Sequence, residues 1–320
     1  MKITILDDYQ NAVEKLPCFK MLNGYNVQVI NKTEKNSTLL ATKLHDTNIL
    51  VLIRERTEIN EQLLSLLPSL KLISQTGKIS NHLNLDVCTK YKVAVAEGVG
   101  SPIAPAELSW ALLMNTVRQI PQAIAAMKNG DWQNNIGSTV NGKTLGIWGY
   151  GKIGGLMAQY AKAFGCTVLI WGSEASRTKA MKDGFKAAGS KEEFFKTADI
   201  ITLHLRLNEK TTGIVKETDL MSMKKDAVLI NTARAELIEK GKLVKCLKAG
   251  TPAFAGIDVY DEEPVYDKSN ELLQLPNVVC TPHLGYVEKS GYELYFTKAF
   301  ENVLNFINGK PTNIANPGVL

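Results

Sequence analysis

The segment Thr144 to Arg177, TLGIWGYGKIGGLMAQYAKAFGCTVLIWGSEASR, decides the fold of this chain. It begins with a short apolar run, Thr144 to Trp148, which predicts a buried strand. The residues from Ile153 to Phe164 have helical spacing, and Thr167 to Trp171 form a second apolar run. The segment is therefore predicted to fold as a strand, a glycine-rich turn, a helix and a second strand.

Three glycines in this segment form a G-x-G-x-x-G fingerprint. After a strand and before a helix, the first glycine allows a tight turn and the second lets the backbone approach a pyrophosphate. The third lets the helix pack closely on the strand, and the pyrophosphate meets the free N–H groups at the start of the helix. We therefore expect a dinucleotide to bind through Gly149, Gly151, Lys152, Ile153 and Gly154.

Composition restricts the class of protein. With 320 residues the chain is long enough for two domains. The net charge of +5 comes from 37 basic and 32 acidic residues without a long basic run, so we expect no nucleic-acid partner. The N-terminus lacks a secretory signal and no apolar stretch reaches the ~20 residues that span a bilayer, so we expect a cytoplasmic protein without a membrane partner. The five cysteines have no C-x-x-C spacing, and we expect no metal site.

Strands and helices alternate along the chain, which predicts an α/β fold with parallel sheets. The predicted strands other than those of the fingerprint unit are Ile3 to Leu6, Val27 to Ile30, Ile49 to Ile53, Leu70 to Ser74, Val93 to Ala96, Ile200 to Leu203, Ala227 to Ile230, Phe254 to Val259 and Val278 to Cys280. Glycines and prolines from Gly98 to Glu107 predict a hinge near Gly100. A long helix is predicted from Glu107 to Lys128, and a last one from Lys289 to Ile307.

Three side chains that can perform chemistry follow predicted strands in the second half of the chain. Arg234 follows one strand, and its guanidinium can bind a carboxylate with two parallel hydrogen bonds. Glu263 lies shortly after the next strand, and His283 follows the last one. A histidine can exchange a proton near neutral pH, and a carboxylate beside it orients the ring and favours its charged form. Together with a dinucleotide, these groups are suited to hydride transfer to or from a 2-hydroxy acid.

The fingerprint, NTARAELI, GIDVYDEEP and TPHLGYVEKSGYE, in this order and spacing, resemble the D-isomer-specific 2-hydroxyacid dehydrogenase family, which includes phosphoglycerate dehydrogenases and glyoxylate/hydroxypyruvate reductases. The resemblance covers nearly the whole chain. It implies that Arg234, Glu263 and His283 are catalytic and that Asp258 contacts the nicotinamide. The implied activity is NAD(P)-dependent interconversion of a small 2-keto acid and its D-2-hydroxy acid.

The resemblance also implies the domain organisation. A Rossmann dinucleotide-binding domain spans 101–287, and a discontinuous flavodoxin-like substrate domain is formed by 1–100 and 288–320. A homodimer built largely on the nucleotide domain is implied as well. The segment LISQTGKISNHLNLD resembles the family loop that holds the substrate carboxylate, a role we assign to Lys78 and Ile79. Arg54 in LIRERTEI is either a ligand for an anionic substrate tail or a surface arginine.

The sequence departs from the family where the cofactor strand ends. The acidic residue that binds the ribose 2′-hydroxyl is replaced by Gly172. Ser173 and Arg177 could instead bind a 2′-phosphate, whereas Glu174 could act as a displaced acidic group. NAD and NADP therefore both remain open as the cofactor.

A second class of function also remains open. The C-terminal-binding corepressors share this fold and the catalytic triad, so the chain could be a dinucleotide-sensing scaffold instead of an enzyme. Formate dehydrogenase is disfavoured because it usually has glutamine at the position of Glu263.

Overall fold

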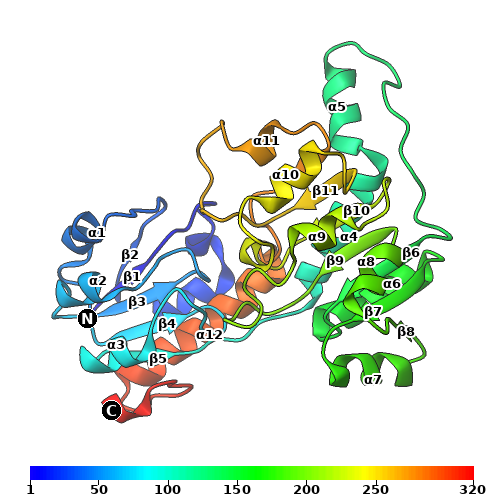
Figure 1. The fold of residues 1–320 in the computed structure, drawn as a ribbon. Coiled ribbons are helices and arrows are strands. Elements are labelled where there is room, and N and C mark those ends of the chain that lie inside the picture. The colour runs from blue at the N-terminus through cyan, green and yellow to red at the C-terminus, as the bar shows by residue number, and fades with distance from the viewer. The chain divides into compact units, whose positions relative to one another are not determined.

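A computed structural model describes residues 1–320, which form two compact units. Unit 1 consists of Met1–Ser101 and Glu288–Leu320, and unit 2 consists of Pro102–Val287. Each unit contains one sheet whose strands are all parallel, flanked by helices (Figure 1). The predicted α/β class is therefore confirmed.

Unit 1 contains a five-stranded sheet in the order β2-β1-β3-β4-β5, which is the flavodoxin-like order. Its strands are β1 (Lys2–Ile5), β2 (Asn26–Val29), β3 (Ile49–Leu52), β4 (Leu72–Gln75) and β5 (Ala94–Ala96). Its helices are α1 (Ser37–Leu44), α2 (Glu61–Ser65), α3 (Leu85–Lys90) and α12 (Lys289–Ile307), with 3-10 turns η1 (Val13–Lys15), η2 (Pro17–Leu22) and η4 (Pro317–Val319). The C-terminal helix α12 packs on β4 and η2, which joins both ends of the chain in one core.

Unit 2 contains a seven-stranded sheet in the order β12-β11-β10-β9-β6-β7-β8. Its strands are β6 (Thr144–Trp148), β7 (Thr167–Trp171), β8 (Lys186–Ala187), β9 (Ile200–Leu203), β10 (Val228–Asn231), β11 (Phe254–Ile257) and β12 (Val278–Cys280). Its helices are α4 (Ile103–Arg118), α5 (Ile120–Lys128), α6 (Lys152–Ala163), α7 (Glu174–Lys182), α8 (Lys191–Thr197), α9 (Glu217–Met221), α10 (Lys242–Lys248) and α11 (Glu271–Gln274), with one 3-10 turn, η3 (Ala235–Leu237). The order around β6 is that of a Rossmann fold.

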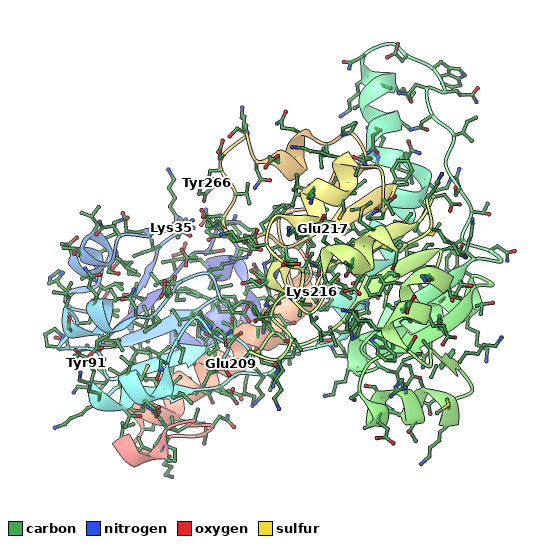
Figure 2. The ribbon with its side chains drawn as sticks, viewed as in Figure 1. Lys35, Tyr91, Glu209, Lys216, Glu217 and Tyr266 are labelled. Carbon is green, nitrogen blue, oxygen red and sulfur yellow. The ribbon has the colours of Figure 1, made fainter.

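Both faces of the unit 2 sheet are covered by apolar side chains. Helices α4 and α6 bury Leu112, Leu113 and Met157 against one face. The other face carries a cluster that includes Phe194 and Phe195, which are fully buried. Charged side chains lie on the outside, where Glu217 at the start of α9 forms ion pairs with two lysines of α10 (Figure 2). Because both faces are covered, only the ends of the strands remain for binding a ligand.

The sequence predicts most of these elements, and the observed strand ends differ from the predicted ones by a residue or two. The single helix predicted from Glu107 to Lys128 is wrong. The chain breaks at Gln119, which has φ of 51° and the left-handed conformation, and α5 then begins with Pro121 in its first turn. The short edge strand β8 was not predicted, since two residues carry no periodicity.

Gly154 of the fingerprint should tolerate no side chain without a shift of the backbone around it. A Cβ at this position would lie 2.0 Å from the backbone oxygen of Gly149, whereas a Cβ at Gly155 on the same helix meets nothing within 4 Å. We expect Gly154→Ala to lower the free energy of unfolding by about 1 to 3 kcal/mol. Gly155→Ala, the matched control, should be neutral or stabilising, because alanine favours a helix. Urea denaturation followed by tryptophan fluorescence measures both, and equal effects would contradict the packing role.

Candidate active site

The fingerprint turn joins β6 to α6 at the carboxyl end of the unit 2 sheet. Gly149 has φ of +103° and donates its N–H to the Trp171 oxygen at 2.9 Å. Gly151 precedes α6, where no side chain caps the helix, and a Cβ on it would meet nothing within 4 Å. Lys152 and Ile153 form the first turn of α6. This open space in front of uncapped N–H groups fits a pyrophosphate.

The end of β7 lies beside this turn. Gly172 has φ of +151°, and a Cβ built on it would lie 3.7 Å from the Gly149 nitrogen. Ser173 caps α7 by accepting the N–H of Ser176 at 3.3 Å. The guanidinium of Arg177 lies 4.9 Å above the ring of Trp171. A ribose bound next to the pyrophosphate would therefore face a serine hydroxyl and a stacked arginine.

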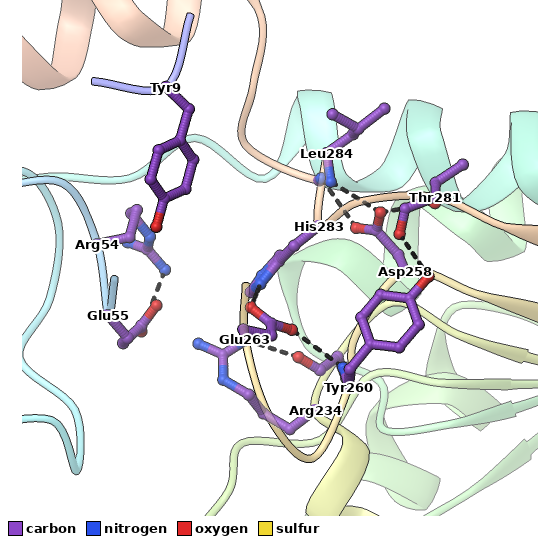
Figure 3. Close-up of polar contacts among 12 residues, drawn as sticks. Tyr9, Arg54, Glu55, Arg234, Asp258, Tyr260, Glu263, Thr281, His283 and Leu284 are labelled. Atoms are coloured by element: carbon purple, nitrogen blue, oxygen red, sulfur yellow. Dashed lines mark hydrogen bonds and ion pairs between the residues drawn. The ribbon is translucent and has the colours of Figure 1, made fainter. Parts of the chain in front are cut away.

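The acidic and basic side chains predicted to work together do meet. Glu263 accepts a hydrogen bond on Oε2 from His283 Nδ1 at 2.5 Å, and its Oε1 accepts the N–H of Tyr260 at 3.0 Å (Figure 3). The side chains of His283 and Glu263 are 20% and 33% exposed. Because Nδ1 is engaged by the carboxylate, His283 Nε2 is the nitrogen left for a substrate.

The loop that carries His283 is fastened by Asp258. This carboxylate is fully buried and accepts hydrogen bonds from the Thr281 hydroxyl and the Leu284 N–H, both at 2.7 Å, and from the Gly285 N–H at 3.0 Å (Figure 3). Burial raises the pKa of Asp258 above its usual range, and these three hydrogen bonds oppose that shift. Asp258 therefore holds both sides of the loop around His283. Its contact with a nicotinamide stays a prediction.

Arg234 lies three residues past the end of β10, and a residue that was not predicted from the sequence fixes its backbone. Asn231, the last residue of β10, is 1% exposed. Its amide donates to the Arg234 oxygen at 2.8 Å and accepts the Ala233 N–H at 3.1 Å. Arg234 Nη1 donates to the Ala233 oxygen at 2.6 Å. The signal available in the sequence was a polar residue at the end of an otherwise apolar strand.

The predicted carboxylate loop follows β4 in unit 1. The backbone N–H of Ile79 donates to Glu97 at 3.0 Å, and the Lys78 ammonium donates to the same carboxylate at 2.6 Å. Arg54 has φ of +54°, and its guanidinium lies 3.6 Å from Glu55 (Figure 3). The Arg54 side chain is 21% exposed, and its role as a ligand for a substrate tail stays a prediction.

Similarity to known proteins agrees with this geometry. The family model for the NAD-binding domain of D-isomer-specific 2-hydroxyacid dehydrogenases matches residues 110–285. The chain belongs to this family. The family assignment inferred from the sequence motifs is thus confirmed.

Three relatives illustrate the range within the family. The structure of a phosphoglycerate oxidoreductase from Vibrio cholerae O395 is 52% identical, with a TM-score of 0.95 over 97% of this chain and 99% of that one. The D-3-phosphoglycerate dehydrogenase of Bacillus subtilis is 35% identical over 88% of this chain and 54% of its own length. The glyoxylate reductase of Thermococcus litoralis is 32% identical over 88% of this chain and 87% of its own length. The chain thus spans about half the length of the curated phosphoglycerate dehydrogenase.

Neither a membrane span nor a metal cluster is found in this member of the family. No helix has both the length and the apolar character needed to cross a bilayer. No group of three or more His, Cys, Asp or Glu side chains is arranged to hold a metal ion.

His204 lies at the end of β9, next to the fingerprint turn, and should make unit 2 sensitive to acid. Burial lowers its pKa to about 4 from the ordinary value of 6.5, and its Nε2 lies 2.9 Å from the Thr202 hydroxyl. Between these two pH values the unfolded chain binds a proton that the folded chain does not, so stability falls as the pH is lowered through this window.

We expect His204→Gln to reduce this acid-dependent loss by about 2 kcal/mol at pH 4.5, because glutamine does not titrate. The measurement is urea denaturation at pH 7 and pH 4.5. All four tryptophans belong to unit 2, so their fluorescence reports on that unit. His45→Gln is the control, since the His45 side chain is 74% exposed and lies in unit 1. The same pH dependence in both variants would contradict the prediction.

Proposed function

We propose that this chain is an NAD(P)-dependent oxidoreductase that interconverts a small 2-keto acid and its D-2-hydroxy acid. The observation that supports this most strongly is the pairing of Glu263 with His283 at the carboxyl end of the sheet that carries the fingerprint. Family membership supports the same reaction class. Neither the family match nor the three relatives support the corepressor alternative.

The nicotinamide, when bound, supplies or accepts the hydride. His283 donates a proton from Nε2 to the substrate carbonyl oxygen during reduction, and accepts it back in the reverse direction. Glu263 holds Nδ1 and favours the charged ring. Arg234 binds the substrate carboxylate and polarises the carbonyl through its planar guanidinium. Asn231 and Asp258 act through their neighbours, by fixing the backbone next to Arg234 and around His283.

Three residues of unit 1 are proposed to bind the substrate. The backbone N–H groups of Lys78 and Ile79 are proposed to bind the substrate carboxylate, and Arg54 is proposed to bind an anionic tail when the substrate carries one. The guanidinium of Arg54 lies against this loop. A Cβ built on Gly77 would be 1.9 Å from Arg54 Nη1. The name of the Vibrio cholerae relative makes phosphoglycerate one candidate among such acids.

A homodimer is the proposed assembly. A group of large apolar side chains along α5 and the segment that follows it is exposed: Ile124, Met127, Trp132 and Ile136 are 50%, 65%, 75% and 94% exposed. Exposed apolar surface of this kind marks an interaction site. A second copy of this chain is the occupant that the family resemblance implies.

The proposed reaction is tested with a panel of 2-keto acids and both cofactors. Wild-type protein should oxidise NADH or NADPH with at least one acid. Glu263→Gln removes the carboxylate that holds His283 Nδ1, so kcat for reduction should fall at least tenfold, or ~1.4 kcal/mol. His283→Ala should lose most activity while still binding cofactor. A wild-type kcat in Glu263→Gln would contradict the pairing.

NADP is the proposed preferred cofactor, since no acidic side chain occupies position 172. Arg177→Ala should lower kcat/KM for NADPH at least tenfold, or ~1.4 kcal/mol, and change the value for NADH little. Glu174→Ala is the matched comparison on the same helix. If the wild type prefers NADH and Glu174→Ala loses that preference, Glu174 binds the ribose and the assignment of NADP is wrong.

A further inference from the structure

The loop from Gly77 to Ile79 has the surroundings of an anion site. It follows β4 at the carboxyl end of the unit 1 sheet. The Arg54 guanidinium occupies the place where a side chain at position 77 would lie, and the Lys78 ammonium extends from the loop itself. Two cationic groups and the backbone N–H of Ile79 favour a negatively charged ligand.

An acidic residue of the chain itself already occupies this site. Glu97 lies just beyond β5, the neighbour of β4 in the sheet. Its Oε1 accepts the Ile79 N–H at 3.0 Å and its Oε2 accepts the Lys78 ammonium at 2.6 Å. The Glu97 side chain is 27% exposed. One carboxylate thus takes a backbone N–H that is proposed to bind the substrate carboxylate.

The backbone of Glu97 is fixed on both sides, which directs its side chain onto the loop. Its N–H donates to the Asn313 oxygen at 2.9 Å, and its oxygen accepts the Asn302 amide at 3.0 Å. Asn302 is buried within α12. The backbone of Glu97 is therefore anchored in the core of unit 1, and its contact with the Ile79 N–H does not depend on the Lys78 side chain, which is 59% exposed.

We propose that Glu97 is a specificity-determining residue that occupies the substrate-carboxylate position, so that a substrate acid must displace it. A second carboxylate at this N–H would be repelled by the like charge of Glu97. A small monocarboxylate that displaces Glu97 forms only the contacts that Glu97 loses, so the exchange adds no contact. Glu97 therefore raises KM for such acids without taking part in hydride or proton transfer. This inference rests on the proposed function of the loop.

The test compares Glu97→Gln and Glu97→Ala with wild type, using glyoxylate and pyruvate as substrates. Both variants remove the competing charge, so KM should fall at least tenfold while kcat changes less than about twofold. Glu61→Gln is the matched control, because Glu61 of α2 also pairs with a lysine of unit 1, Lys90 of α3, at 2.5 Å, and neither residue belongs to the loop. Its kinetic constants should equal those of wild type. An unchanged or higher KM in Glu97→Gln would overturn the proposal, and would assign Glu97 to ordering the loop.

A binding measurement separates this proposal from the proposed reaction. Oxamate is a small carboxylate that is not reduced, and its affinity for the cofactor-bound protein is measured by calorimetry. Oxamate should bind Glu97→Gln at least tenfold more tightly than wild type, even if no keto acid of the panel is reduced. Reduction by wild type with equal oxamate affinities in both proteins would overturn only the role of Glu97. Absence of reduction with tighter binding to the variant would overturn only the reaction. If Glu97→Ala unfolds at the assay temperature, Glu97→Gln alone decides.

Discussion

The buried carboxylate of Asp258 is the interaction on which the proposed catalytic geometry depends. His283 has φ of 51°, a left-handed conformation that is uncommon for residues other than glycine. Such a backbone persists only where its surroundings determine it. Asp258 supplies that constraint by accepting hydrogen bonds on both sides of His283, from Thr281 before it and from Leu284 and Gly285 after it. The histidine is thus aimed by a group that need not touch the substrate.

The same loop is tied to Glu263 through Tyr260. The Tyr260 N–H donates to Glu263, and its hydroxyl donates to the Thr281 oxygen at 2.9 Å. Burial raises the pKa of the Tyr260 hydroxyl, so this group remains a neutral donor at any pH at which the protein would work. Tyr260 therefore connects Glu263 to the loop that carries His283. The positions of Glu263 and of that loop are consequently fixed by hydrogen bonds between backbone groups and the side chains of Glu263, Tyr260 and Asp258.

Much of the fold could be predicted because its signals are local. Strands such as Thr144–Trp148 appear as apolar runs, and the fingerprint glycines indicate the turn. Arg234, Glu263 and His283 could be proposed because each follows such a strand. Asn231 was not predicted, and Asp258 was predicted only as a nicotinamide contact. Their roles in holding the backbone depend on contacts that only the folded sheet creates. The break at Gln119 was missed for a related reason: a single left-handed residue leaves the apolar spacing on either side unchanged.

At two further positions, Glu97 and Gly172, the family pattern alone does not predict what the structure shows. The sequence places Glu97 after a strand without indicating that its carboxylate turns to the neighbouring loop, because that contact depends on the order of β4 and β5. At Gly172 the sequence shows that an acidic side chain is missing, but the structure adds that φ of +151° disfavours any side chain there. Restoring an acidic residue would therefore also require a change of backbone. In the proposed function, selectivity for the ribose is therefore assigned to the residues that follow, where Ser173 caps α7 and Arg177 is stacked on Trp171.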